Sequence, residues 1–297
     1  MENGRIVRFL IIIFALLTLI FYALYFVEEK KTSVLSEEFV EQAVNNLNAR
    51  GVEIDESVIL RRIPDKDIYV FEGKDAEDYA LKIATAFAKG FETEMFTAKL
   101  STPSGFSMAL YENSQMEKEI GKFHFSENDF SFVYSAVSTS ITPTSTVVNN
   151  DEIVLDEAVE KLIEKILLNM NEEKELSYRI SGSVENENFL IVSVVQTFEN
   201  TDVQGAYINF VFEDGYLVHA LGNWIAYKPK VQYSAKMYDG VNVLYKTDLE
   251  QLQKIVSQRT LYSFKKGKDN KYFIIPCWEI TSVDKKGNII KEYFDAL

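Results

Sequence analysis

The sequence predicts an α+β fold in which a single N-terminal transmembrane helix precedes two related helix-plus-antiparallel-meander units. Residues 9–27 form an unbroken apolar run. An amphipathic helical pattern followed by short alternating segments then occurs twice, in residues 28–150 and 151–297. Within them, IGKFHFSENDFSFVYSAV (120–137) and GAYINFVFEDGYLVHAL (205–221) share the spacing of a strand, an acidic turn and a second strand. This shared spacing indicates a structural repeat.

The apolar run FLIIIFALLTLIFYALYFV comprises 19 residues. As a helix with a rise of about 1.5 Å per residue it extends roughly 28 Å, close to the thickness of the hydrocarbon core of a bilayer. The run has no small-residue cleavage pattern at its end and continues directly into Glu28-Glu29-Lys30-Lys31. We therefore expect residues 1–27 to be a cytoplasmic start and an uncleaved membrane anchor.

The charges that flank the run predict its orientation. Arg5 and Arg8 precede it, and Lys30 and Lys31 follow it, so the two sides carry equal numbers of basic side chains. The free amino terminus adds a positive charge and favours a cytoplasmic start. No second apolar run of about 18 residues exists, so we expect a single-pass protein of the cell membrane with an extracytoplasmic C-terminal part.

The first predicted unit, residues 28–150, begins with the helical segment SEEFVEQAVNNLNARG, where Ser36 is a candidate N-cap and Gly51 ends the helix. A strand is expected at Asp67–Phe71, and a second helix at residues 75–89. Three short strands follow, at 105–113, 120–128 and 129–137. Residues 138–150, STSITPTSTVVNN, carry no charge and are predicted to be a linker.

The second predicted unit, residues 151–297, repeats this order. DEIVLDEAVEKLIEKILLN is a helical pattern, and Asp214-Gly215 is a hairpin turn signal. Thr247 and Glu250 form a capping-box pattern that predicts a helix in TDLEQLQKIV. The expected strands are LSYRISGSV, FLIVSVVQTF, GAYINFVFED and YLVHALGNW, followed at the end by a hairpin with Lys286-Gly287 in its turn.

Charge and cysteine content narrow the classes of partner. The chain has a formal net charge of −14, and removing residues 1–27, which contribute +1, leaves −15 on the remainder. Such a surface repels nucleic acid and anionic headgroups, so we expect no nucleic-acid partner.

Cys277 is the single cysteine, which excludes an intramolecular disulfide and is typical of a small buried side chain. Trp224 and Trp278 lie among alternating apolar residues and are expected in the core.

The sequence contains few residues in patterns that are typical of an active site. The two histidines, His124 and His219, each lie within an alternating strand pattern, and no zinc, nucleophile-elbow or phosphate-loop motif is present. Two Ser-x-x-Lys matches occur, beginning at Ser263 and Ser282, but neither opens a helix and no Lys-Thr-Gly follows. We therefore expect no enzyme activity, no catalytic residues, no metal site and no cofactor.

The end of the chain, FIIPCWEITSVDKKGNIIKEYFDA, resembles the YycH/YycI family of accessory proteins of the Yyc (Wal) two-component system of low-GC Gram-positive bacteria, and YycI more closely. The short start, the anchor at 9–27 and the helix-plus-meander pattern extend the resemblance over the full length. The resemblance implies a non-enzymatic regulator that associates with a sensor histidine kinase and with a YycH-like paralogue, and so modulates genes of cell-wall metabolism.

If the anchor is itself a contact surface, one of its faces should differ from the others. Ala15, Thr18, Tyr22 and Tyr25 follow one another at spacings of 3, 4 and 3, so they share one side of a helix. We predict that this face binds the partner. The alternative interpretation is that Tyr22 and Tyr25 belong to the interfacial aromatic belt and that the two small residues are incidental.

Two other classes of function fit the same sequence. One is a PepSY-like extracytoplasmic binding module that holds a peptide, a wall fragment or a protease, in which case the part beyond the anchor binds its ligand alone. The other is an exported hydrolase that uses paired carboxylates, which would show turnover that survives replacement of Ser263 and Ser282.

Overall fold

The computed structural model describes thirteen ranges of the chain and two single residues. They are residues 13–22, 34–62, 65–72, 76–91, 96–102, 105–112, 118–126, 131–137, 148, 150, 153–171, 176–186, 188–227, 230–266 and 271–296. The chain divides into two compact units, each built from separate segments. The α2 unit comprises residues 1–66, 235–259 and 278–297, and the α3/α4 unit comprises residues 67–234 and 260–277.

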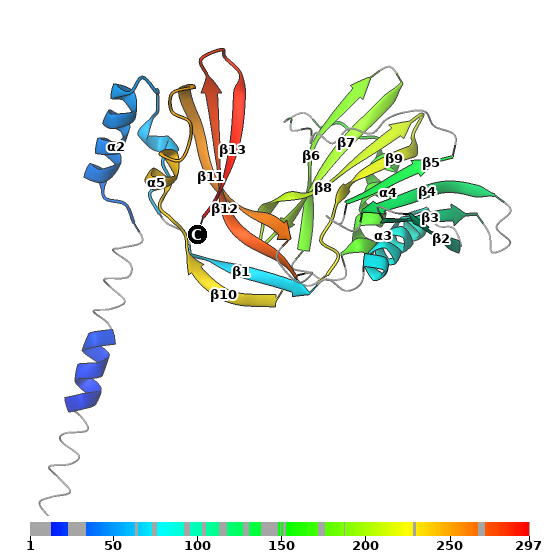
Figure 1. Ribbon diagram of the computed structural model, residues 1–297, viewed down its shortest axis with the longest axis horizontal. Coiled ribbons are helices and arrows are strands. Elements are labelled where there is room, and N and C mark those ends of the chain that lie inside the picture. Colours follow the sequence, from blue (N-terminus) through cyan, green and yellow to red (C-terminus); the bar gives the residue numbers. More distant parts are fainter. Residues whose placement is uncertain are drawn as a thin grey trace, which may run out of the picture. The chain divides into compact units, whose positions relative to one another are not determined.

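The α3/α4 unit is built on an extended antiparallel ladder (Figure 1). Its spatial order is β6–β7–β8–β9–β5–β4–β3–β2. The strands are β2 (Phe96–Thr102), β3 (Gly105–Tyr111), β4 (Glu119–Ser126), β5 (Ser131–Ala136), β6 (Leu176–Asn186), β7 (Phe189–Phe198), β8 (Thr201–Glu213) and β9 (Tyr216–Asn223). Asp214 and Gly215 both have positive φ, 50° and 80°, and they form the predicted turn between β8 and β9.

Strand β8 has two different neighbours along one of its edges. Its later residues pair with β9, whereas Val203 and Gln204 pair in parallel with β11 (Leu252–Lys266). Gly205 separates the two pairings and has a φ of +87°, a conformation that residues with a side chain rarely adopt. The sheet therefore divides at this glycine.

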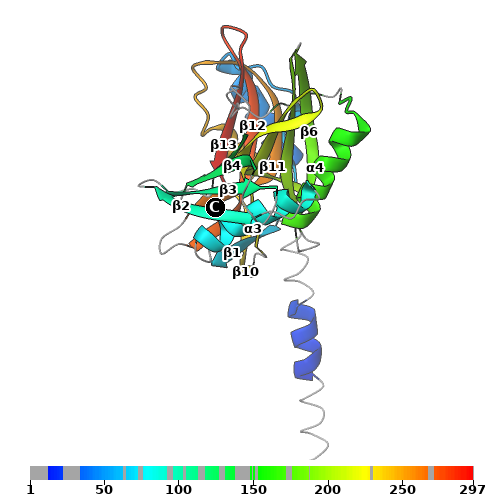
Figure 2. The ribbon, with the colours of Figure 1, turned by 90° about the vertical axis from the view of Figure 1, so that its right-hand side faces the viewer.

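Helices α3 (Ala76–Gly90) and α4 (Glu157–Met170) pack against the core that the ladder provides (Figure 2). Phe87 of α3 is fully buried, and its ring centroid lies 5.0 Å from that of Phe123 on β4 and 6.1 Å from that of Phe210 on β8. A single helical side chain thus contacts strands from both halves of the chain.

The α2 unit contains α2 (Glu37–Ala49), the short helices η1 (Glu56–Val58) and α5 (Gly240–Leu244), and strand β13 (Ile289–Asp295). Parts of β11 and of β12 (Lys271–Asp284) complete it. Ser36 is the N-cap of α2, since its Oγ accepts the Phe39 N–H at 3.3 Å, and Gly51 beyond the C-cap has a φ of 84°. Both assignments confirm the predicted ends of this helix. Strands β1 (Asp65–Glu72) and β10 (Lys230–Lys236) lie mostly in the α3/α4 unit, where β1 pairs with the beginning of β12.

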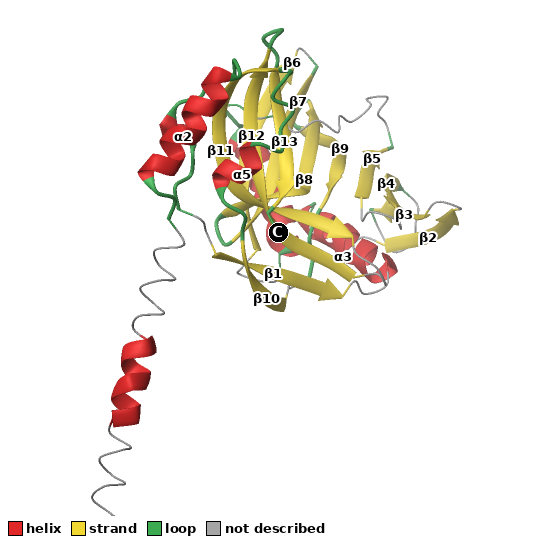
Figure 3. Ribbon diagram, turned by 60° about the vertical axis from the view of Figure 1, so that its left-hand side comes forward, coloured by secondary structure: helices red, strands yellow, loops and turns green. Residues whose placement is uncertain are grey.

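The predicted fold class is wrong. The described residues form a 13-stranded mixed sheet rather than two separate helix-plus-meander units, as the predominance of strands in Figure 3 illustrates. The two predicted meanders merge because β5 pairs with β9, with Ser135 opposite His219. The boundary expected at residue 150 lies inside the α3/α4 unit.

The helix predicted in TDLEQLQKIV is also wrong. Residues 245–251 form turns, and β11 begins at Leu252. Leu252, Ile255 and Gln258 are the buried residues at the start of this strand, and their spacing of three resembles the period of a helix. The final hairpin is confirmed, with Gly287 at a φ of 86° between β12 and β13.

The predicted membrane anchor at 9–27 is described in part. Residues 13–22 are helical, whereas 9–12 and 23–27 lie outside the described residues. Within the described part of the chain, no helix combines the length and the apolar character needed to cross a bilayer.

Candidate functional site

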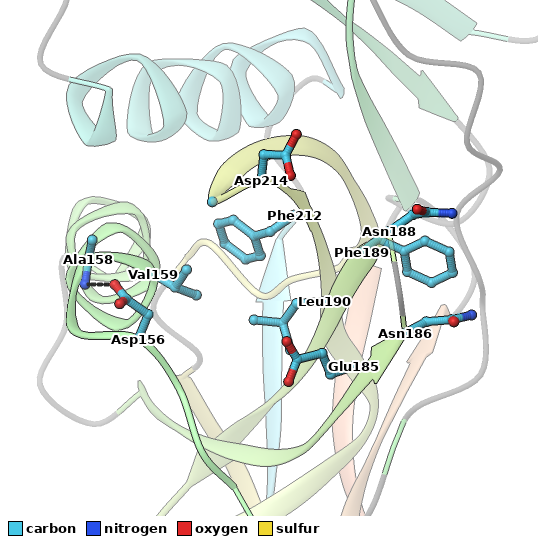
Figure 4. A pocket seen from close by; sticks show the side chains of 11 residues that line it. Asp156, Ala158, Val159, Glu185, Asn186, Asn188, Phe189, Leu190, Phe212 and Asp214 are labelled. Carbon is cyan, nitrogen blue, oxygen red and sulfur yellow. Dashed lines mark hydrogen bonds between the residues drawn. The ribbon is translucent and has the colours of Figure 1, made fainter.

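A pocket of about 370 Å³ opens in the α3/α4 unit, where the start of α4 meets the β6–β7 and β8–β9 hairpins (Figure 4). Its volume lies within the usual range of ligand pockets. The lining residues are Asp156, Ala158, Val159, Glu185, Asn186, Asn188, Phe189, Leu190, Phe212, Asp214 and Gly215.

Strand register produces one wall of this pocket. Glu185 on β6 pairs with Leu190 on β7, and Leu190 pairs in turn with Phe212 on β8. Because directly paired residues project to the same face of a sheet, the three side chains form a row across three strands. Phe212 is buried and Leu190 is partly buried, while Glu185 at the end of the row is exposed. The row therefore runs from an apolar floor to a carboxylate.

The start of α4 provides the opposite wall. Asp156 is the N-cap of α4, and its Oδ1 accepts the Ala158 N–H at 2.7 Å. Val159 turns inward and is buried in the same core as Phe212. Figure 4 shows Val159, Leu190 and Phe212 grouped at the centre of the site, with Asp156 and Asp214 beside them.

The site is acidic. Asp156, Glu185 and Asp214 contribute three exposed carboxylates, and the lining contains no lysine, arginine or histidine. No ion pair forms to these three carboxylates from the described residues. The pocket thus combines an apolar floor with uncompensated negative charge, which favours a ligand that is both cationic and partly apolar.

Two Ser–His pairs lie elsewhere on the ladder. The Oγ of Ser107 lies 3.2 Å from Nδ1 of His124, and the Oγ of Ser135 lies 3.0 Å from Nδ1 of His219. Both pairs join residues directly opposite on neighbouring strands. His219 Nδ1 also lies 3.2 Å from the Tyr134 carbonyl oxygen, which can only accept a hydrogen bond, so this nitrogen is assigned as a donor. A nitrogen that donates cannot act as the base for the serine, and the pair lacks the arrangement of a catalytic triad.

A tyrosine–carboxylate cluster holds the β7–β8 turn. Glu199, at a φ of 49°, accepts hydrogen bonds from the hydroxyl groups of Tyr69 at 2.5 Å and Tyr262 at 2.9 Å. Burial first, and then the hydrogen bond to Glu199, raises the pKa of both tyrosines above its ordinary value. Both carboxylate oxygens are therefore occupied, which fits a role in holding the turn.

The predicted partner-binding residues fall in the first helical segment. Ala15, Thr18 and Tyr22 lie within residues 13–22, and Tyr25 lies outside the described residues. The Thr18 hydroxyl donates to the Phe14 carbonyl oxygen at 2.8 Å, inside its own helix. The proposed contact through this face stays a prediction, as does association with a sensor histidine kinase and a YycH-like paralogue.

The other singled-out residues are placed in strands or in the core. Ser263 is buried in β11 and its hydroxyl donates to Gln204 at 3.1 Å, while Ser282 is buried in β12. Trp224, Trp278 and Cys277 are also buried, so their assignment to the core is confirmed. Among the described residues, no three His, Cys, Asp or Glu side chains gather closely enough to hold a metal ion.

Sequence reasoning identified Asp214-Gly215 as a turn but did not identify the pocket. Glu185, Leu190 and Phe212 come together only through the pairing of three strands, and their spacing along the chain carries no motif. The alternation of the strands predicts which residues share a face, whereas it leaves the register open.

Comparison with known proteins finds no matching family model and no matching curated protein sequence. Among solved structures, the chain is similar to an uncharacterized protein from Eubacterium rectale ATCC 33656, with 10% identity over 79% of this chain and 84% of that one and a TM-score of 0.46. It is also similar to the Bacillus megaterium YpeB C-terminal domain, with 12% identity over 74% of this chain and 92% of that one and a TM-score of 0.35.

Proposed function

We propose that this chain is a non-enzymatic binding module, PepSY-like in its mode of action, that holds a cationic peptide segment in the pocket of the α3/α4 unit. The observation that carries the proposal is the combination of three carboxylates with a floor of Phe212 and Leu190. A peptide offers both a positive side chain and adjoining apolar groups, so it matches both parts of the pocket. Anionic wall polymers match neither the charge nor the floor.

The proposed binding should depend on the charge of the peptide and on the salt concentration. Exposed charges interact weakly, and each pair contributes on the order of 0.2–1 kcal/mol, which corresponds to a change in affinity of up to about fivefold. Because such pairs are screened by salt, affinity should fall when the ionic strength rises from about 0.01 M to 0.15 M. Acidic peptides of the same length should bind more weakly than basic ones.

The test is a titration of the full-length chain, in a nonionic detergent, with fluorescent lysine-containing peptides and with muropeptide fragments. Neutralising two pocket carboxylates, with Glu185→Gln and Asp214→Asn, should weaken peptide binding roughly two- to thirtyfold. Asparagine tolerates the positive φ of residue 214, so the turn is preserved.

A matched control removes the same charge from residues that do not line the pocket, with Asp248→Asn and Glu250→Gln in the α2 unit. Equal losses in the two double variants would mean that net charge alone attracts the peptides. Binding of muropeptides but not of lysine peptides would overturn the cationic assignment.

A further inference from the structure

Strand β6 lies at an edge of the ladder. Along one side it pairs with β7 from Leu176 to Asn186. Among the described residues, its other side meets a short piece of the chain at Val148 and Asn150. An edge strand presents unpaired backbone N–H and C=O groups, which are able to hydrogen-bond with a further strand.

Asn150 occupies part of this edge in the manner of a peptide unit. Its Oδ1 accepts the Ser183 N–H at 2.9 Å, and its Nδ2 donates to the Ser183 carbonyl oxygen at 2.8 Å. Its own backbone N–H donates to the Ser181 carbonyl oxygen at 3.2 Å. The side-chain amide thus makes the same pair of hydrogen bonds that an added strand would make to Ser183, which demonstrates that this edge accepts amide partners.

Glu185 is the next residue of β6, after Ser183, whose backbone groups face this edge. Backbone groups two residues apart in an antiparallel strand point to the same side, so the N–H and C=O of Glu185 point away from β7, as those of Ser183 do. The described residues supply no hydrogen-bond partner to Glu185 on that side. Its side chain meanwhile belongs to the pocket row, beside Leu190.

Val184, the residue before Glu185, provides a second environment along this edge. Val184 projects to the opposite face of β6 and is 44% exposed. A strand laid against this edge would place alternate side chains beside the Glu185 carboxylate and beside the Val184 methyl groups. Alternating cationic and apolar residues in the ligand fit these two environments.

We infer that the β6 edge at residues 184–186 takes up an extended peptide by strand addition, with main-chain hydrogen bonds to Glu185 and a lysine or arginine side chain directed towards its carboxylate. Strand addition obtains affinity from the main chain and selectivity from alternate side chains. This inference rests on the proposed function and specifies how the ligand of that same pocket is held.

The experiment uses the full-length chain in a nonionic detergent and, as probe, an end-blocked fluorescent peptide of about nine alternating lysine and valine residues, a length typical of one strand. A second peptide carries N-methyl groups on every other amide and therefore cannot donate those hydrogen bonds. We expect the N-methylated peptide to bind about two- to tenfold more weakly, since the main-chain hydrogen bond to the Glu185 carbonyl oxygen is lost.

Two variants separate the backbone from the charge. Glu185→Pro removes the outward N–H and leaves the ladder to β7 intact, because proline is tolerated in an edge strand where its nitrogen faces outward. Glu185→Gln keeps the N–H and removes the charge. We expect Glu185→Gln to retain the preference for the unmethylated peptide. Glu185→Pro should bind that peptide more weakly than Glu185→Gln does, because proline removes the hydrogen bond from the residue 185 N–H in addition to the charge.

A circular dichroism melt that matches the parent chain establishes that the Glu185→Pro variant is folded; if it is not, the comparison of the two peptides on the parent chain decides alone. Equal binding of both peptides to the parent chain would overturn strand addition. In that case, weaker binding by the Glu185→Gln and Asp214→Asn double variant would still support a pocket that binds the peptide through its side chains. No binding of the lysine–valine peptide up to about 1 mM, the weak limit of specific recognition, would also overturn the inference.

Discussion

Replacing Ser193 by alanine tests whether the chain at Val148 is fixed to the sheet. Ser193 on β7 is fully buried; its hydroxyl donates to Asn209 Oδ1 at 2.7 Å and accepts the Val148 N–H at 2.8 Å. Alanine removes both interactions at once. A buried polar group deprived of its partner costs about 1–3 kcal/mol, and Val148 is only half-buried. We therefore expect Ser193→Ala to lower the free energy of unfolding by roughly 2–4 kcal/mol.

The assay is urea unfolding followed by circular dichroism, with amide hydrogen exchange at Val148 as a local readout. Ser183→Ala is the matched control, because Ser183 bonds to Asn150 through its backbone, which the substitution retains. Its effect should stay within about 0.5 kcal/mol. If Ser193→Ala cost no more than this control, and if Val148 exchanged as before, the reasoning about this polar contact would be refuted.

Three further outcomes test the core. Phe87→Ala should cost about 3–5 kcal/mol in urea unfolding, since it removes a fully buried ring from an aromatic cluster. Gly90→Ala places a Cβ 2.3 Å from Ile166 Cγ1, so it should destabilise by about 1–3 kcal/mol, and adding Ile166→Ala should cost less than the sum of the single changes. Burial raises the pKa of Tyr134 to about 12, so the folded state keeps its proton where the unfolded state, with a pKa near 10, loses it. Stability is therefore fully present below pH 10 and falls as the pH rises from about 10 towards 12, and Tyr134→Phe should flatten that fall in thermal melts at fixed pH.

Local chemistry made the helix ends and turns predictable. Ser36 and Gly51 delimit α2 through a hydroxyl that caps an amide and a glycine at positive φ, and both signals lie within a few residues of the feature they specify. Asp214-Gly215 is predictable for the same reason. Each of these features depends on neighbours in the chain.

Long-range pairing was not predictable in the same way. The pairing of Ser135 with His219 joins residues 84 positions apart, and the sequence of neither strand identifies its partner strand. The pocket row depends on the same kind of information, because a shift of one residue would remove Glu185 from the side of Leu190. Ahead of β11, the capping-box pattern of Thr247 and Glu250 favoured a helix where the structure has turns followed by a strand.

The segmented construction of the α2 unit bears on how the chain acquires its structure during synthesis. This unit draws on residues before 67, on 235–259 and on 278–297. Glu53 bridges to Lys254, and the Tyr238 N–H donates to the carbonyl oxygen of Ala296, which is itself buried. Since chains emerge at about 5–20 residues per second, α2 waits on the order of ten seconds or more for its last strand. Throughout that time its apolar face, including Val40 and Leu47, has no completed core to enter, so a translating chain must be protected from aggregation at this unit.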